Sequence, residues 1–210
     1  MHDISNMQFH GYLEALIGSK ISIRIVRALI DYPGKIFTVR KLAETAKVSA
    51  SEAAAVVQQL EKYGALRIQP VGRSYLLTLN DDSYILNKIL RPLIKAEQDT
   101  LGALALMLKS ILDNDGIESA ALFGSVAAGK EREDSDIDLL VISDNLDAAT
   151  LLVADAQEQV SAAFNGRVSA LIMSQKELAK KKNDQLMRSI LANHVTVAGK
   201  DLKELISISD

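Results

Sequence analysis

An apolar segment that begins with two carboxylates constrains this sequence of 210 residues more than any other feature. It reads "DIDLLVI" from Asp136 to Ile142, and it follows a Gly-Ser pair and a polar loop. Side chains alternate along a strand, so Asp136 and Asp138 point to the same side. Two neighbouring carboxylates repel each other unless a cation lies between them. Mg²⁺ prefers such oxygen ligands, and the pattern therefore predicts a buried strand with a Mg²⁺ site at its start.

The Gly-Ser pair, Gly124-Ser125, ends an earlier apolar run, "IESAALF", that is typical of a buried strand. Glycine allows a phosphate to approach the backbone closely. The N–H groups of a helix start, together with a serine hydroxyl, can bind an anion. The simpler alternative is that Gly124 only turns the chain and Ser125 only caps a helix. The carboxylate pair that follows favours a phosphate site.

The stretch "GSVAAGKEREDSDIDLLV" resembles the signature of the DNA polymerase beta-like nucleotidyltransferase superfamily, above all its minimal prokaryotic members. The resemblance covers about residues 95–205 and extends to Gly129 and Ser135. It implies an α+β fold, a small mixed sheet flanked by helices, and transfer of a nucleoside monophosphate from an NTP, expected to be ATP, to a protein or small-molecule hydroxyl. The residues it implies are Gly124, Ser125 and Ser135 for the nucleotide, and Asp136 and Asp138 as catalytic ligands of two Mg²⁺ ions.

The family usually supplies a third carboxylate from a neighbouring strand. The corresponding segment is "GRVSALIMSQKEL", which places Ser169 where an aspartate is expected. Loss of a positioned base commonly costs a factor of about 10² to 10⁴ in rate. Glu131, Glu133 or Asp134, in the loop before the pair, are the remaining acids that could replace it.

The charge balance differs between the two parts of the chain. Residues 18–80 contain ten Lys and Arg and four acids, a net charge of +6, whereas the remainder has a net charge of −9. Helical periodicity begins at Ser19 and ends at Pro33-Gly34. A short helix is predicted after Thr38, and a longer one from Ser49 or Ser51 to Gly64. Two short strand patterns around "VGR" predict a hairpin.

This order resembles a winged helix-turn-helix along residues 19–80. The resemblance implies that the helix from Ser51 to Tyr63 is a recognition helix and that the hairpin tip contacts phosphates. The residues expected to bind DNA are Arg40, Lys41, Ser51, Gln58, Gln59, Lys62 and Arg73. The recognition helix lacks arginine and carries Glu52, which would repel phosphate. Dimerisation or docking of another protein is therefore the alternative role of this domain.

The predicted organisation has four parts: an N-terminal helical extension (1–17), a winged helix-turn-helix domain (18–82), connecting helices (83–112) and a nucleotidyltransferase-like domain (113–210). The chain has no Cys, which excludes disulfides and thiolate ligands, and its three His are far apart in sequence. Its longest apolar run, "LGALALML", is shorter than the roughly 20 residues that a membrane span needs. The start has an acid where a signal peptide needs basic residues. We expect a cytoplasmic protein without membrane contact.

Three functions follow from these patterns. The first is an enzyme that transfers a nucleoside monophosphate. The second is a DNA-binding transcriptional regulator whose degenerate nucleotidyltransferase domain senses a nucleotide, and Ser169 motivates it. The third is a nucleotidyltransferase that acts beside a helical partner protein, as minimal members of the family do in toxin–antitoxin pairs. A homodimer is a further partner that the sequence leaves open.

Overall fold

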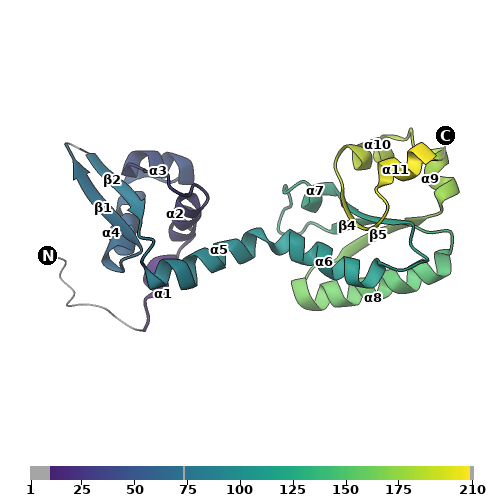
Figure 1. Cartoon of the computed structure of the whole chain (residues 1–210), viewed down its shortest axis with the longest axis horizontal. Helices are drawn as coiled ribbons and strands as arrows, with labels where there is room; N and C mark the ends of the chain where they lie inside the picture. The colour runs from purple at the N-terminus through teal and green to yellow at the C-terminus, as the bar shows by residue number, and fades with distance from the viewer. Residues whose placement is uncertain (1–9, 73, 209–210) are drawn as a thin grey trace. The chain divides into compact units, whose positions relative to one another are not determined.

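The computed structural model describes residues 10–72 and 74–208. The chain divides into an N-terminal unit, Met1–Gln98, and a C-terminal unit, Asp99–Asp210 (Figure 1). The division falls within residues 83–112, the segment predicted to connect two domains. Leu86 and Leu90 belong to the core of the N-terminal unit, whereas Leu104 and Leu108 belong to a core of the C-terminal unit. These helices therefore contribute residues to the cores of the two units.

The N-terminal unit consists of helices followed by a two-stranded hairpin. Its elements are α1 (Leu13–Ile17), α2 (Lys20–Ile30), α3 (Val39–Ala46), α4 (Ala50–Lys62), β1 (Leu66–Val71), β2 (Ser74–Leu79), the π-helix η1 (Leu86–Leu90) and α5 (Arg91–Gln98). The order predicted for residues 19–80 is therefore present. Of the predicted N-terminal extension, residues 1–9 lie outside the described residues.

The helix starts in this unit follow from side-chain caps. The hydroxyls of Ser19 and Thr38 accept hydrogen bonds from the backbone N–H groups three residues later, at 3.0 and 3.2 Å. Ser49, and not Ser51, caps α4, where it forms a reciprocal capping box with Glu52. Gly64 follows α4 with φ +72°, the left-handed conformation predicted for it.

Buried aliphatic side chains from α2, α3, α4, the hairpin and η1 form the core of the N-terminal unit. Val56, Val57 and Leu60 of α4 face this core, as their spacing predicts. Pro92 is the second residue of α5, and Arg91 separates it from the π-helix. Proline is tolerated in the first turn of a helix because no N–H is needed there.

The C-terminal unit is a four-stranded sheet covered by helices. Its elements are α6 (Thr100–Leu112), β3 (Ser119–Phe123), α7 (Gly124–Ala127), β4 (Ile137–Ile142), α8 (Leu146–Phe164), β5 (Val168–Met173), α9 (Gln175–Lys181), α10 (Gln185–Ala192), β6 (Val195–Gly199) and α11 (Leu202–Ile208). The strand order is β5-β4-β3-β6. β3 pairs antiparallel with β4 and β6, whereas β4 and β5 are parallel and are joined through α8. The sheet is therefore small and mixed, as the resemblance implies.

The two faces of this sheet bury different sets of residues. Leu139 and Val141 of β4 pack in one core with α6 and α8, whereas Leu140 and Ile142 pack in another with α9, α10 and α11. Figure 1 shows α6 and α8 on one side of the sheet and α9, α10 and α11 on the other. Because side chains alternate, Asp138 lies on the α9–α11 face, at the end of the strand where the helices no longer cover it. Among the described residues, no helix is long and apolar enough to cross a membrane.

Candidate functional site

The carboxylate of Asp138 lies directly against Gly124. Phe123, the last residue of β3, is paired with Asp138 of β4, so the turn that follows β3 passes beside this carboxyl group. Gly124 has φ +74°, and a Cβ atom at this position would collide with the Asp138 carboxylate. The carboxylate pair and the Gly-Ser turn, which are separate in sequence, thus meet at one end of the sheet.

Asp136 lies next to Asp138 but has a partner of its own. The Nε of Arg167 donates to Oδ1 of Asp136, and its Nη2 donates to Oδ2, both at 2.7 Å. This two-point contact is the strong geometry for a guanidinium and a carboxylate. The predicted cation ligand Asp136 is therefore ion-paired within the protein. Arg167, its partner, was not among the residues singled out from the sequence.

The neighbouring strand β5 supplies no carboxylate to this end of the sheet. In the parallel pairing of β4 with β5, Ser169 is the partner of Asp138. Arg167, two residues earlier, is level with Asp136. Ser169 of β5 and Arg167, the residue before β5, thus place a hydroxyl and a positive charge beside the aspartates.

The pKa values of the two aspartates are shifted in opposite directions. The hydrogen bonds from Arg167 lower the pKa of Asp136. Burial raises the pKa of Asp138, and the negative charge of the neighbouring Asp136 raises it further. Asp138 is half-buried, and the Arg167 guanidinium pairs with Asp136 and not with Asp138. Asp138 is therefore the carboxyl group that a bound cation would stabilise most.

The other two residues predicted to bind the nucleotide lie in the same region. Ser125 is half-buried in α7, one residue beyond Gly124. The Ser135 hydroxyl accepts a hydrogen bond from the Arg132 backbone N–H at 2.8 Å, and the Ser135 N–H donates to the Arg132 carbonyl at 3.0 Å. Ser135 thus closes the loop that leads into Asp136, and its hydroxyl hydrogen stays available for another acceptor.

The donor set fits one divalent cation better than two. Asp136 and Asp138 present carboxylate oxygens on one face, and the charge of Asp136 raises the pKa of Asp138, so a hard cation shared with phosphate oxygens and water would suit them. Across residues 10–72 and 74–208, no three His, Cys, Asp or Glu side chains come together as a metal site. Glu131, Glu133 and Asp134 are exposed on the loop and do not complete such a group.

A second polar cluster lies on β6 and α11 of the same unit. The ring of His194 is 5% exposed, with Nδ1 3.0 Å from the Ile190 carbonyl and Nε2 3.1 Å from Oδ2 of Asp201. Thr196 donates to the same Oδ2, and the backbone N–H of Lys203 donates to Oδ1. These bonds lower the pKa of Asp201, the one from Lys203 most. Asp201 therefore caps α11 and joins it to β6, which is a structural role.

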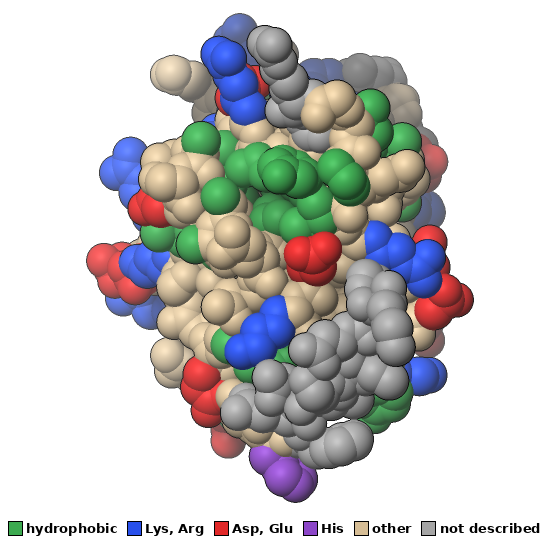
Figure 2. All heavy atoms as spheres, turned by 90° about the vertical axis from the view of Figure 1, so that its left-hand side faces the viewer, with side chains coloured by type: hydrophobic (Ala, Val, Ile, Leu, Met, Phe, Trp, Pro, Cys, Tyr) green, Lys and Arg blue, Asp and Glu red, His purple; other side chains and the backbone are tan. Residues whose placement is uncertain are grey.

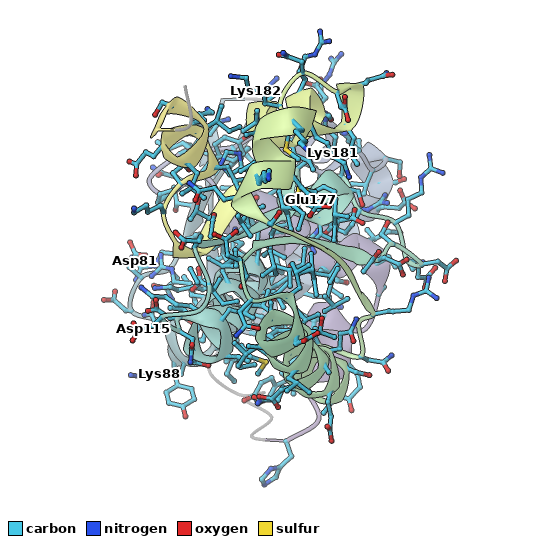
Figure 3. The ribbon with its side chains drawn as sticks, turned by 90° about the vertical axis from the view of Figure 1, so that its right-hand side faces the viewer. Asp81, Lys88, Asp115, Glu177, Lys181 and Lys182 are labelled. Atoms are coloured by element: carbon cyan, nitrogen blue, oxygen red, sulfur yellow. The ribbon has the colours of Figure 1, made fainter. Side chains whose placement is uncertain are left out.

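The lysine run 180–182 ends α9. Figure 3 shows Glu177, Lys181 and Lys182 on this short helix. The hydroxyl and backbone N–H of Ser174 form a capping box with Glu177, and these hydrogen bonds, together with the charges of Lys181 and Lys180, lower its pKa. The positive charge of the lysine run is therefore partly balanced by Glu177.

The residues predicted to bind DNA are exposed in the N-terminal unit, but some are ion-paired. Arg40 and Lys41 of α3 contact Glu44 at 3.5 and 3.2 Å. The four residues predicted on α4 are all exposed: Ser51, Gln58, Gln59 and Lys62.

Lys62 and Arg73 are the remaining basic residues predicted to bind DNA. The Nζ of Lys62 lies 5.7 Å from the centre of the Tyr63 ring, and Arg73 lies outside the described residues. On the face displayed in Figure 2, hydrophobic side chains gather in one patch, and basic and acidic side chains lie around it.

Comparison with family models gives one match, which lies in the C-terminal unit. The family "Polymerase beta, Nucleotidyltransferase" matches residues 107–202. None of the curated proteins matches the sequence significantly.

Three solved structures are similar to parts of the chain. A toxin–antitoxin crystal structure with AMP-PNP is 16% identical, with a TM-score of 0.37, over 50% of this chain and 82% of that one. A mutant of the toxin–antitoxin MntA-HpeT is 14% identical, with a TM-score of 0.37, over 52% and 82%. The archaeal chromatin protein TrmBL2 is 18% identical, with a TM-score of 0.29, over 86% and 72%.

The family match and the geometry coincide on the same segment. It contains the Gly-Ser turn, both aspartates and all four strands of the sheet. The segment that matches this family model is therefore the segment that carries the candidate site.

Proposed function

We propose that the C-terminal unit binds a nucleoside triphosphate together with one Mg²⁺ ion, and that the N-terminal unit is a winged helix that binds DNA. The protein would then act as a nucleotide-responsive DNA-binding regulator. The observation that supports the nucleotide site is the Asp138 carboxylate, which is half-buried, lies against Gly124 and has its pKa raised by burial and by the charge of Asp136. Such a group is costly in the ligand-free protein and becomes favourable when a cation binds.

Each residue of the site has a role in this proposal. Asp138 and, after release from Arg167, Asp136 would hold Mg²⁺. The glycine at position 124 leaves room for a phosphate, and the backbone and hydroxyl of Ser125 would donate to it. The hydroxyl of Ser135 can donate a further hydrogen bond. When bound, Mg²⁺ would neutralise charge on the triphosphate, for which ATP is the expected form.

Binding without rapid transfer agrees best with the residues on β5. A transfer reaction needs a group that activates the acceptor hydroxyl, and Ser169 stands where the family has an acid. A serine does not take up a proton near neutral pH. We therefore expect that nucleotide binding persists while chemistry is slow.

A second candidate is transfer of a nucleoside monophosphate to a protein or small-molecule hydroxyl. The retention of both aspartates and of the Gly-Ser turn within the matched segment favours it. Asp138 would have the same role in both candidates, so one set of measurements separates them.

The test compares the wild-type protein with the Asp138→Asn variant. We expect ATP to bind the wild type in the presence of Mg²⁺, and calorimetry to show affinity about 100-fold lower in the variant, equivalent to nearly 3 kcal/mol. Equal affinity in the two proteins would reject the site. Incubation with α-labelled ATP and candidate acceptors decides between the candidates, since label transfer by the wild type alone would establish the enzyme.

The DNA-binding role needs its own measurement. Fluorescence anisotropy with duplex DNA should show affinity that falls steeply with salt, because phosphate contacts release counterions. Addition of ATP and Mg²⁺ should change this affinity in the wild type and not in Asp138→Asn. If ATP binds but leaves DNA affinity unchanged, the regulatory link fails although the nucleotide site stands.

A further inference from the structure

Arg167 faces the proposed cation site from the residue before β5. The parallel pairing begins at Ile137 and Val168, and the Ile137 N–H donates to the Arg167 carbonyl at 2.8 Å. The strand ladder thus extends to Arg167, whose side chain emerges on the same face as Asp136. The backbone therefore places the guanidinium next to this carboxylate.

The preceding residue packs closely against β4. A Cβ atom at Gly166 would lie 2.7 Å from Cδ1 of Ile137. Because Ile137 is buried, a larger residue at position 166 would require the Ile137 side chain to shift. Gly166 thus allows close packing directly beside the pair formed by Arg167 and Asp136.

The contact occupies both oxygens of Asp136. Each oxygen accepts one hydrogen bond at 2.7 Å. The Arg167 side chain is 81% exposed and that of Asp136 is 33% exposed. Exposed pairs of this kind open at modest cost, so a competing cation can displace the guanidinium.

We infer that Arg167 is a resident counter-ion of the cation site, which holds Asp136 until a divalent cation displaces it. Because of this competition, the cation binds first through Asp138 and gains Asp136 only when the Arg167 side chain moves away. The inference rests on the proposed function, since it assigns a role within the proposed cation site. It makes Arg167 a residue that sets the cation affinity of the domain.

An ordinary surface ion pair would have a different consequence. Such a pair adds a little stability and leaves ligand affinity unchanged. A resident counter-ion weakens cation binding, and its removal must strengthen that binding specifically through Asp136.

The experiment measures Mn²⁺ binding to the full chain without nucleotide, by the electron paramagnetic resonance signal of free Mn²⁺. Wild type is compared with Arg167→Gln and with Arg188→Gln. Arg188 is an exposed arginine of α10 in the same unit that donates to the Asn183 carbonyl, so its substitution removes the same charge elsewhere. We expect Arg167→Gln to bind Mn²⁺ about three- to tenfold more tightly, and Arg188→Gln to match the wild type.

A double variant shows whether Asp136 carries the gain. In Arg167→Gln/Asp136→Asn the tighter binding should disappear, because the ligand that Arg167 releases is no longer charged. Equal Mn²⁺ affinity in wild type and Arg167→Gln, equal gains in both arginine variants, no measurable binding by Arg167→Gln, or a gain that survives the double substitution would each overturn the inference. Circular dichroism confirms that the variants are folded.

The outcome is separate from that of the proposed function. The proposed function fails when ATP binds wild type and Asp138→Asn alike, whatever Mn²⁺ does. The inference fails when ATP binding depends on Asp138 but Mn²⁺ affinity does not respond to position 167.

Discussion

The two units balance their charges in different ways. In the N-terminal unit, basic side chains pair with acids of the same unit: Arg40 and Lys41 with Glu44, and Arg27 with Glu97. In the C-terminal unit, Arg167 pairs with Asp136, whereas the half-buried Asp138 has its pKa raised by burial and by the charge of Asp136. Asp138 is therefore the carboxylate that the proposed cation would stabilise most.

Of the substitutions that test this comparison, Gly124→Ala should have the largest effect on ATP affinity and on stability. Alanine at φ +74° is strained, and its Cβ would collide with the Asp138 carboxylate. We expect ATP affinity to fall about 10- to 100-fold, the range seen when a metal ligand is displaced. The free energy of unfolding should fall by about 1–3 kcal/mol. Calorimetry and urea denaturation measure the two effects.

Gly129→Ala is the matched control for stability. Gly129 has φ +61° in the same unit, and no atom lies within 4 Å of a Cβ placed there. Gly129→Ala thus introduces the same kind of backbone strain without a collision with another side chain. If both variants lose equal stability and Gly124→Ala still binds ATP, the contact between Gly124 and Asp138 is irrelevant to the site.

Ser169→Asp tests whether the proposed cation site accepts a further ligand. The register places this position beside Asp138, so a new carboxylate would add to the cation site. We expect Mn²⁺ affinity to rise about tenfold, since carboxylate number tunes such sites. Ser169→Asn, similar in size but uncharged, should leave it unchanged. Equal effects of the two substitutions would show that position 169 does not face the cation.

The parts of the site that the sequence predicts are those set by short-range patterns. Alternation within one strand indicates that Asp136 and Asp138 share a face, and a hydroxyl residue before a helical period indicates the caps at Thr38 and Ser49. Arg167 could not be placed in this way. Its contact with Asp136 depends on the register of β5 against β4, and α8 separates these strands in the chain.

The same limit applies to the N-terminal unit. Its basic residues are visible in the sequence, but whether an acid neutralises them depends on distant partners. Arg27 and Glu97 are 70 residues apart in the chain. Composition predicts a positive charge of +6 for residues 18–80, and it does not show that part of this charge is held in ion pairs.

Asp201 offers a balanced carboxylate to compare with Asp138. Hydrogen bonds, first from Lys203 N–H and then from Thr196 and His194, lower its pKa. The stability that it contributes is therefore complete above its ordinary value of 3.8 and is lost as the pH falls through its lower folded value. Its side chain is 40% exposed, so Asp201→Ala should cost only about 1 kcal/mol at pH 6. Urea denaturation should show a smaller difference from wild type near pH 3. If Asp201→Ala lowers the free energy of unfolding equally at pH 6 and near pH 3, the charge of Asp201 does not contribute to stability.

Glu44→Gln has the smallest expected effect and tests the ion pairs of the N-terminal unit. It releases Arg40 and Lys41 from their acid, and both become available for phosphate. Exposed pairs contribute about 0.2–1 kcal/mol, so DNA affinity should rise about two- to threefold. The slope of log affinity against log salt should become steeper, because more phosphates are neutralised. Glu14→Gln removes the same charge from exposed α1 and serves as the control. Equal gains in both variants would attribute the change to net charge, whereas a gain in Glu44→Gln alone would show that the ion pairs of α3 restrain a surface that contacts DNA.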